Sequence, residues 1–255
     1  MRVGIIQSNY IPWRGYFDFI ASVDIFVFHD DIQYTKADWR NRNRIKAPDG
    51  TPWLTVPVHY HTVSQLICDT RINNQTHWAS KHVRLLQEHY RHAPYLQTAL
   101  DLFKSALEEA GTETTISVLN IAMIRRICAY LGIDTRLMLS SELDPVGTKT
   151  GRLLDMLGKL GATAYLSGPA ADSYIDKQAF CRAGIQLEYK SYDYQAYPQL
   201  WGPFVGAVSV LDLIANCGPD SANYLHSHTA NNIVVPGQMK YPALDQHTNL
   251  LHSNS

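Results

Sequence analysis

Residues 1–31 read MRVGIIQSNYIPWRGYFDFIASVDIFVFHDD. The apolar run 2–7 predicts a buried strand that ends in polar residues. Proline and glycine mark 9–15 as a loop, residues 16–23 predict a short helix, and the apolar run 25–28 predicts a second strand. Strand, loop, helix and strand in about 30 residues form a βαβ unit, whose two strands are parallel and are joined by a right-handed crossover.

Strand and helix patterns continue to alternate along the rest of the chain. Further strands are predicted at 53–59, 135–139, 164–167 and 185–189, and helices at 151–160, 173–182 and 209–215. This alternation predicts an α/β protein with a mostly parallel sheet. We expect the sheet domain to take residues 1–75 and 132–225, a helical insertion or subdomain to take 76–131, and a tail at 226–255 to lie on the body or pair with a neighbour.

Composition excludes several classes of protein. The chain has 255 residues and a formal net charge of −1, and it is 45% hydrophobic and 11% aromatic. A disordered chain would be poor in aromatic residues and highly charged. A non-specific nucleic-acid binder would carry a strong positive excess, so we do not expect one, although a specific tRNA partner is left open. No apolar run is long enough for a membrane span or a signal-peptide core, so we expect a cytoplasmic protein.

The cysteines and histidines indicate no metal site. Cys68, Cys128, Cys181 and Cys217 lie far apart without C-x-x-C or zinc-ribbon spacing, which is typical of reduced thiols. Three histidine pairs could each supply two ligands, but no spacing identifies a third. The excess of 15 tyrosines over 7 phenylalanines points instead to a polar organic ligand, and we expect tyrosines to line a polar cleft.

Polar residues follow several of the predicted parallel strands. Ligands of such sheets bind beyond the carboxyl ends of the strands, so we expect the binding site there. The candidates for substrate binding are Gln7, Asn9, Tyr10, Trp13 and Arg14 in the first loop, Gln33 and Tyr34 after the second strand, and Ser167 after a later strand. The candidate catalytic residues are Asp31 and Asp30, and Asp31 is the predicted general base because a strand-end carboxylate can be aimed inward. The alternative for this pair is a turn or a cap.

The segment ADWRNRNRIK, residues 37–46, has the densest pattern of polar and cationic residues. Arginine forks suit phosphate or carboxylate, and tryptophan suits stacking on a base or a sugar. Strand alternation would put Arg40, Arg42 and Arg44 on one face and the asparagines on the other. We predict an anion clamp made of Asn41, Arg42, Asn43 and Lys46. The alternatives are a solvated face and a structural hairpin.

These blocks together resemble the WbqC-like protein family over about residues 1–225. The blocks that carry the resemblance are QSNYIPWRGYFD at 7–18, DDIQY at 30–34, WRNRNRIK at 39–46, YLSG at 165–168, SVLDL at 209–213 and CGP at 217–219. The family is found among bacterial O-antigen and surface-polysaccharide biosynthesis genes. The resemblance therefore implies a role in surface-glycan or related metabolite biosynthesis.

A looser similarity concerns the fold. A strand, then Pro12-x-x-Gly15 at a helix start, then a strand ending in aspartate is similar to the opening of nucleotidylyltransferases and pantothenate synthetase. This similarity implies a Rossmann-like sheet. Those proteins carry a His-x-Gly-His signature that stabilises the transferring phosphate, and here both histidines are missing.

The main hypothesis is a group transferase, because the sequence has no G-x-G-x-x-G or other redox-cofactor motif. We expect acyl, aminoacyl or related transfer to a small-molecule substrate with an anionic group, from an activated donor such as a nucleotide-sugar, acyl or aminoacyl compound. One alternative is a nucleotidyltransferase-like enzyme with a degenerate signature. Another is a non-catalytic module that binds a nucleotide, a nucleotide-sugar or tRNA. A homo-oligomer is compatible with each of these readings.

Overall fold

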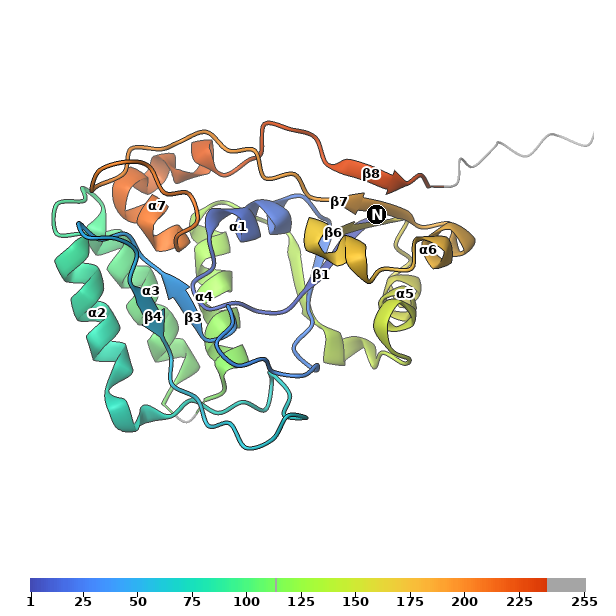
Figure 1. The fold of residues 1–255 in the computed structure, drawn as a ribbon, viewed down its shortest axis with the longest axis horizontal. Coiled ribbons are helices and arrows are strands. Elements are labelled where there is room, and N and C mark those ends of the chain that lie inside the picture. Colours follow the sequence, from blue (N-terminus) through green and yellow to red (C-terminus); the bar gives the residue numbers. More distant parts are fainter. Residues whose placement is uncertain (113, 238–255) are drawn as a thin grey trace, which may run out of the picture.

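The computed structural model describes residues 1–112 and 114–237, and one mixed sheet organises them (Figure 1). Its strand order is β5-β2-β1-β6-β7-β8. The strands are β1 (Arg2–Ile6), β2 (Ile25–Phe28), β5 (Arg136–Leu139), β6 (Ala164–Ser167), β7 (Gln186–Tyr189) and β8 (Asn232–Val235). All neighbouring pairs are parallel except β7 with β8. The predicted α/β class with a mostly parallel sheet is confirmed.

The opening βαβ unit forms as the sequence predicts. β1 and β2 pair in parallel, with Val3 opposite Ile25 and Ile6 opposite Phe28, and α1 (Arg14–Ala21) connects them. Gly4 lets the helix lie close to the strand, because a Cβ atom at this position would be 2.4 Å from the ring of Phe19. Only a glycine therefore permits this packing of α1 on β1.

Both faces of the sheet are covered by helices, as expected for a parallel sheet. Figure 1 shows α2 (Trp78–His89), α3 (Leu96–Ala110), α4 (Ile116–Tyr130) and α7 (Val210–Cys217) on one side of the sheet, and α5 (Lys149–Lys159) and α6 (Lys177–Ala183) on the other. The alternation of β2 explains the two layers. Phe26 and Phe28 belong to the apolar core that includes α1, α3, α4 and α7, whereas Ile25 and Val27 belong to the core that includes α5 and α6.

The predicted helices of residues 76–131 are present as α2, α3 and α4. Thr115 begins α4, where its side chain accepts a hydrogen bond from the N–H of Val118, and Gly132 follows the helix with φ of 69°. This is the αL geometry that glycine favours after a helix. The buried apolar side chains of α2, α3 and α4 belong to the same core as Phe26 and Phe28 of β2. The division into separate domains stays a prediction.

Two segments differ in detail from the expectations. The predicted strand 53–59 ends early as β4 (Trp53–Thr55), which pairs with β3 (Arg42–Arg44) in a hairpin outside the main sheet. Pro57 explains the short strand, because proline has no N–H for a ladder. The predicted helix 173–182 is divided into a 3-10 turn at Pro169–Ser173 and α6, whose N-cap is Asp176.

The predicted C-terminal tail contributes to the sheet. β8 pairs antiparallel with β7, with Tyr189 opposite Asn232, and so covers that edge of the sheet. The rest of the predicted tail, residues 238–255, lies outside the described residues. Throughout the described part of the chain, none of the helices combines the length and the apolar character that a membrane crossing needs.

Candidate functional site

The strand order reverses between β1 and β6. The chain runs from β1 to β2 and β5 on one side, and then returns to β6 and β7 on the other. At such a switch point the loops diverge at the carboxyl ends of the strands and leave a crevice, which is the usual ligand site of open α/β sheets. Here the crevice is a cavity of about 710 Å³, which we call the switch-point cavity. Its lining includes Gln7, His29, Lys149, Thr150, Arg152, Tyr165, Ser167, Gly168 and Tyr174.

Two cations lie at the start of α5, where the helix meets this cavity. Lys149 is exposed there and has no ion-pair partner among residues 1–112 and 114–237. The N-cap residue Thr148 makes no side-chain hydrogen bond to the first turn. Free backbone N–H groups and the helix dipole favour anions at a helix N-terminus. Arg152, one turn along, adds a guanidinium group, so this end of the switch-point cavity is suited to an anionic group.

His29, Asp31 and Arg152 form a charged group at the edge of the cavity. Asp31 accepts a hydrogen bond from the Ser140 hydroxyl on Oδ1 and another from Arg152 on Oδ2, the latter at 2.5 Å. Nε2 of His29 accepts a long hydrogen bond of 3.4 Å from Nε of Arg152 and is 3.8 Å from Oδ1 of Asp31. Burial lowers the pKa of His29 and outweighs the opposing effect of the Asp31 carboxylate. The imidazole is therefore neutral at neutral pH and can accept a proton.

Asp30 lies beneath the site and faces away from the cavity. Its carboxylate is buried and accepts hydrogen bonds from the backbone N–H of Ser8, at 2.7 Å, and from the hydroxyl of Ser117. Its own carbonyl oxygen accepts from the N–H of Cys68 at 2.9 Å. Asp30 thus joins the loop after β1 to α4.

Some residues of the first loop line one of two cavities, and others are buried in the protein. Gln7 lines the switch-point cavity, whereas Asn9 and Trp13 line a smaller pocket. Tyr10 is fully buried, with its hydroxyl 2.8 Å from Nδ1 of His82. Arg14 is also buried, and its guanidinium donates to the carbonyl oxygens of Gln195 and Tyr224. Tyr10 and Arg14 therefore lie behind the surface that a ligand would touch.

The predicted anion clamp does not line the switch-point cavity, and the polar groups of Asn43 and Lys46 form hydrogen bonds inside the protein. Asn43 Nδ2 donates to the carbonyl oxygens of Tyr10 and Ile11, at 3.1 and 2.9 Å. Lys46 is buried and its Nζ donates to Gln199 Oε1 at 2.8 Å. Burial also lowers the pKa of Lys46.

The other members of the clamp segment lie in the hairpin of β3 and β4. Asn41 Nδ2 donates to the carbonyl oxygen of Val56 at 2.8 Å. Arg42 and Arg44 lie 4.3 and 4.5 Å from the ring centroid of Trp53. The predicted alternation is confirmed in this strand, since Asn43 is buried between Arg42, which is half-buried, and Arg44, which is exposed.

The remaining predicted residues also differ in whether they line the switch-point cavity. Ser167 is nearly buried and lines the switch-point cavity. Gln33 is exposed, and Tyr34 is buried with its ring 6.0 Å from that of Tyr60. The expectation that the tyrosines of these blocks line a cleft is wrong for Tyr10, Tyr16 and Tyr34, which are core residues. The tyrosines of the cavity are Tyr165 and Tyr174.

Sequence reasoning missed the cationic residues of the site and His29. A signal for the first two was present in GTKTGR, residues 147–152, where two cations follow a glycine at a helix start. His29 stands directly after the strand residue Phe28, in the position that the strand-end rule indicates. The two adjacent aspartates that follow His29 form a more familiar motif, which favoured Asp31 as the base.

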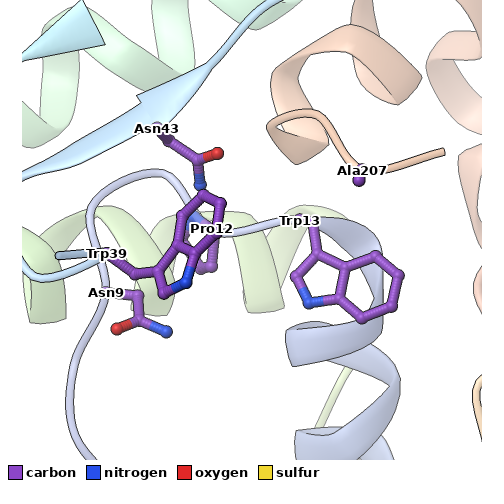
Figure 2. A pocket seen from close by; sticks show the side chains of 6 residues that line it. All are labelled: Asn9, Pro12, Trp13, Trp39, Asn43 and Ala207. Atoms are coloured by element: carbon purple, nitrogen blue, oxygen red, sulfur yellow. The ribbon is translucent and has the colours of Figure 1, made fainter. Parts of the chain in front are cut away.

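A smaller pocket is lined by Asn9, Pro12 and Trp13 of the first loop. Its volume is about 240 Å³, and its lining residues are Asn9, Pro12, Trp13, Trp39, Asn43 and Ala207. Figure 2 shows these side chains, which come from the first loop, the hairpin around β3 and the segment before α7. We call it the tryptophan pocket.

The fold and the site define a doubly wound α/β protein with a cationic cavity at the point where the strand order reverses. The chain belongs to the WbqC-like protein family, whose family model matches residues 7–224. It is also 47% identical to the uncharacterized protein Rv1507c of Mycobacterium tuberculosis over 227 residues, which cover 88% of this chain and 97% of that protein. No solved structure matches the chain.

Proposed function

We propose that this protein is a group transferase that moves an acyl or aminoacyl group from an activated anionic donor to an amine. The observation that carries the proposal is the switch-point cavity, where the cations of α5 and the neutral imidazole of His29 face one space. Gln7 and Ser167 add polar groups to the same wall. A convergence of polar groups and a titratable residue with a shifted pKa in one large cavity is typical of an active site.

The anionic part of the donor binds at the start of α5. Lys149 supplies an ammonium group that has no ion-pair partner among the described residues, and Arg152 supplies a guanidinium group. Arg152 is already held by Asp31 and by the carbonyl oxygen of Pro145, at 2.5 and 2.7 Å. A cation that is held in place before the substrate arrives loses little conformational entropy on binding, so it suits a phosphate or carboxylate of the donor.

We assign proton transfer to His29 rather than to Asp31. His29 lines the switch-point cavity and Asp31 does not, and both carboxylate oxygens of Asp31 accept hydrogen bonds, from Ser140 and from Arg152. In the proposed step the amine nitrogen attacks the acyl carbon, the new C–N bond forms, and the bond to the leaving group breaks. The amine proton passes to His29, and the leaving group takes the electron pair as an anion near Arg152 and Lys149. Asp31, 3.8 Å from His29, stabilises the imidazolium that results.

Family membership supports the wider context of this proposal. WbqC-like genes lie among those for bacterial surface polysaccharides, so the substrates we favour are intermediates of surface-glycan or secondary-metabolite biosynthesis. Such intermediates carry phosphate or carboxylate groups, which match the cationic end of the switch-point cavity.

Anion binding tests the first half of the proposal. Isothermal titration with pyrophosphate should show saturable binding, and Lys149→Gln and Arg152→Gln should each weaken it by about 10- to 150-fold, the usual worth of a hydrogen bond to a charged group. Arg126→Gln is the matched control, because Arg126 pairs with Glu109 on the surface of α4 and α3. Unchanged affinity in both cavity variants would remove the anion site.

Turnover separates an enzyme from a binding module. A panel of acyl phosphates and aminoacyl adenylates is offered with amine acceptors, and products are detected by mass spectrometry. His29→Gln should keep pyrophosphate affinity and lose turnover, and Asp31→Asn should lower turnover less. Full turnover in His29→Gln contradicts the proposed base, and pyrophosphate binding with no turnover on any donor favours the binding module.

A further inference from the structure

We propose that the tryptophan pocket binds a flat, unsaturated ring of the second substrate. This inference rests on the proposed group transfer, which needs two substrates side by side. The pocket has a volume of about 240 Å³, enough for one ring rather than a whole nucleotide. The chemistry proposed for the switch-point cavity does not use the tryptophans of the tryptophan pocket.

The position of the pocket suits an acceptor site. Gln7 lines the switch-point cavity and Asn9 lines the tryptophan pocket. Residues two apart in a chain have Cα atoms within about 7 Å of each other. The two cavities are therefore lined by neighbouring residues of one loop, which suits two substrates that bind next to each other.

The aromatic walls of the pocket are held by other aromatic and cationic side chains. Trp39 is 44% exposed, and its ring centroid is 5.5 Å from that of Trp53. Arg42 and Arg44 both stack on Trp53, which fixes this supporting ring. Trp13 packs against Tyr192 with ring centroids 5.2 Å apart. An exposed indole supported in this way presents a rigid stacking surface at low entropic cost.

The polar groups of the pocket favour a flat ring over a sugar. Asn43 spends both Nδ2 hydrogens on the carbonyl oxygens of Tyr10 and Ile11. Asn9 accepts from Arg40 through Oδ1, which leaves its Nδ2 group without a partner among the described residues. A pyranose presents several hydroxyl groups that each need a partner. One free amide donor near the indoles suits an unsaturated ring that carries an acceptor atom, such as a nucleobase or an aromatic acid.

Ligand-observed NMR titration of the full chain tests this assignment. The probes are adenosine, benzoate and methyl α-glucopyranoside, so that the first two arms separate a nucleobase from an aromatic acid. We expect saturable binding of adenosine or benzoate and no preference for the sugar. Trp39→Ala should weaken ring binding by about 5- to 150-fold, whereas Trp39→Phe, which keeps a flat face, should stay close to the wild type.

Two controls keep this test separate from the test of the proposed function. Lys149→Gln should lose pyrophosphate affinity and keep ring binding, because Lys149 lines the switch-point cavity and not the tryptophan pocket. Circular dichroism melting checks that Trp39→Ala is folded, as its exposure predicts. The proposal is overturned if neither flat ring binds, if Trp39→Ala binds as the wild type does, or if the sugar binds more tightly than both rings.

Discussion

Asp30 Oδ1 accepts a 2.7 Å hydrogen bond from the backbone N–H of Ser8, and this bond ties the loop after β1 to the end of β2. Both residues are buried. The bond fixes the backbone between Gln7 and Asn9, which line the two cavities. The shape of the candidate site therefore depends on an aspartate that a ligand does not touch.

Replacing Asp30 should destabilise the protein. Asp30→Ala leaves the Ser8 N–H and the Ser117 hydroxyl buried without an acceptor, at a cost of about 1–3 kcal/mol for each donor. Urea unfolding followed by circular dichroism measures the loss. The double variant Asp30→Ala/Ser117→Ala should lose less than the sum of the single variants, because the stranded hydroxyl is gone. Additive losses would contradict the direct Asp30–Ser117 contact.

A buried ion pair joins α1 to the segment after β7. Lys190 Nζ is 2.6 Å from Asp18 Oδ2, and both side chains are less than 5% exposed. Lys190→Ala removes the buried cation beside Asp18, whose carboxylate keeps hydrogen bonds from the Tyr194 hydroxyl and the Ser227 N–H. We therefore expect a loss of about 3 kcal/mol in the free energy of unfolding, the lower end of the range for a broken buried pair.

A surface pair provides the matched control for this variant. Lys177→Ala breaks the pair with Asp172, whose side chains are 45% and 52% exposed, and should change stability by less than about 1 kcal/mol. Asp18→Asn combined with Lys190→Met should recover part of the loss. Equal effects of Lys190→Ala and Lys177→Ala would show that burial does not set the strength of the Asp18–Lys190 pair.

Acid should destabilise the protein through His82. Burial lowers the pKa of His82 from 6.5 to about 4 in the folded state. Between these pH values the unfolded chain binds more protons than the folded protein, so stability rises with pH across this range. The free energy of unfolding should therefore fall by up to about 3 kcal/mol as the pH drops from 6.5 to 4, and the loss should level off below pH 4.

The variant His82→Gln isolates this contribution. Its amide can still hydrogen-bond to the hydroxyl of Tyr10, which lies 2.8 Å from Nδ1 in the wild type. The comparison is made by urea unfolding at a series of pH values. His82→Gln should show a flatter profile between pH 4 and 6.5, and an unchanged profile would assign the acid sensitivity to other groups.

Gly15 should control the position of Trp13. A Cβ atom at Gly15 would lie 2.3 Å from Cζ2 of the Trp13 indole, so Gly15→Ala must displace this ring. We expect a changed tryptophan fluorescence spectrum, weaker ring binding in the tryptophan pocket, and a stability loss of about 1–3 kcal/mol. Gly151→Ala, where a Cβ would meet nothing within 4 Å, is the control. Unaltered fluorescence in Gly15→Ala would contradict the packing of Trp13 on α1.

Local patterns predicted the elements of the sheet well. The strand 164–167 appears with the predicted bounds, and the βαβ unit of residues 1–31 appears in the predicted order. These elements depend on runs of apolar side chains and on short-range punctuation, both of which are visible in a sequence. The separation of β3 and β4 from the main sheet was not visible, because strand partners are chosen by tertiary packing.

The candidate site was predictable by region and not by residue. The rule that ligands bind beyond the carboxyl ends of parallel strands indicated the edge of the sheet where Gln7 and Ser167 line the cavity. It could not show that Asp30 faces inward and His29 faces the cavity. The direction of a side chain in a loop depends on partners far away in the sequence, such as Ser117 and Arg152.

The sequence alone determined the α/β class, the opening βαβ unit and the family, because each is encoded in local patterns and motifs. Tertiary structure decided which polar residues are free to act. Arg14, Asn43 and Lys46 have the chemistry of a binding site, but the fold buries them and their hydrogen bonds hold backbone carbonyl groups. The crossover after β5 brings the start of α5 beside the end of β1, so that Lys149 and Arg152 line the switch-point cavity. A polar side chain is most available to a ligand where the folded chain leaves part of its hydrogen-bonding capacity unused, as at the exposed Lys149.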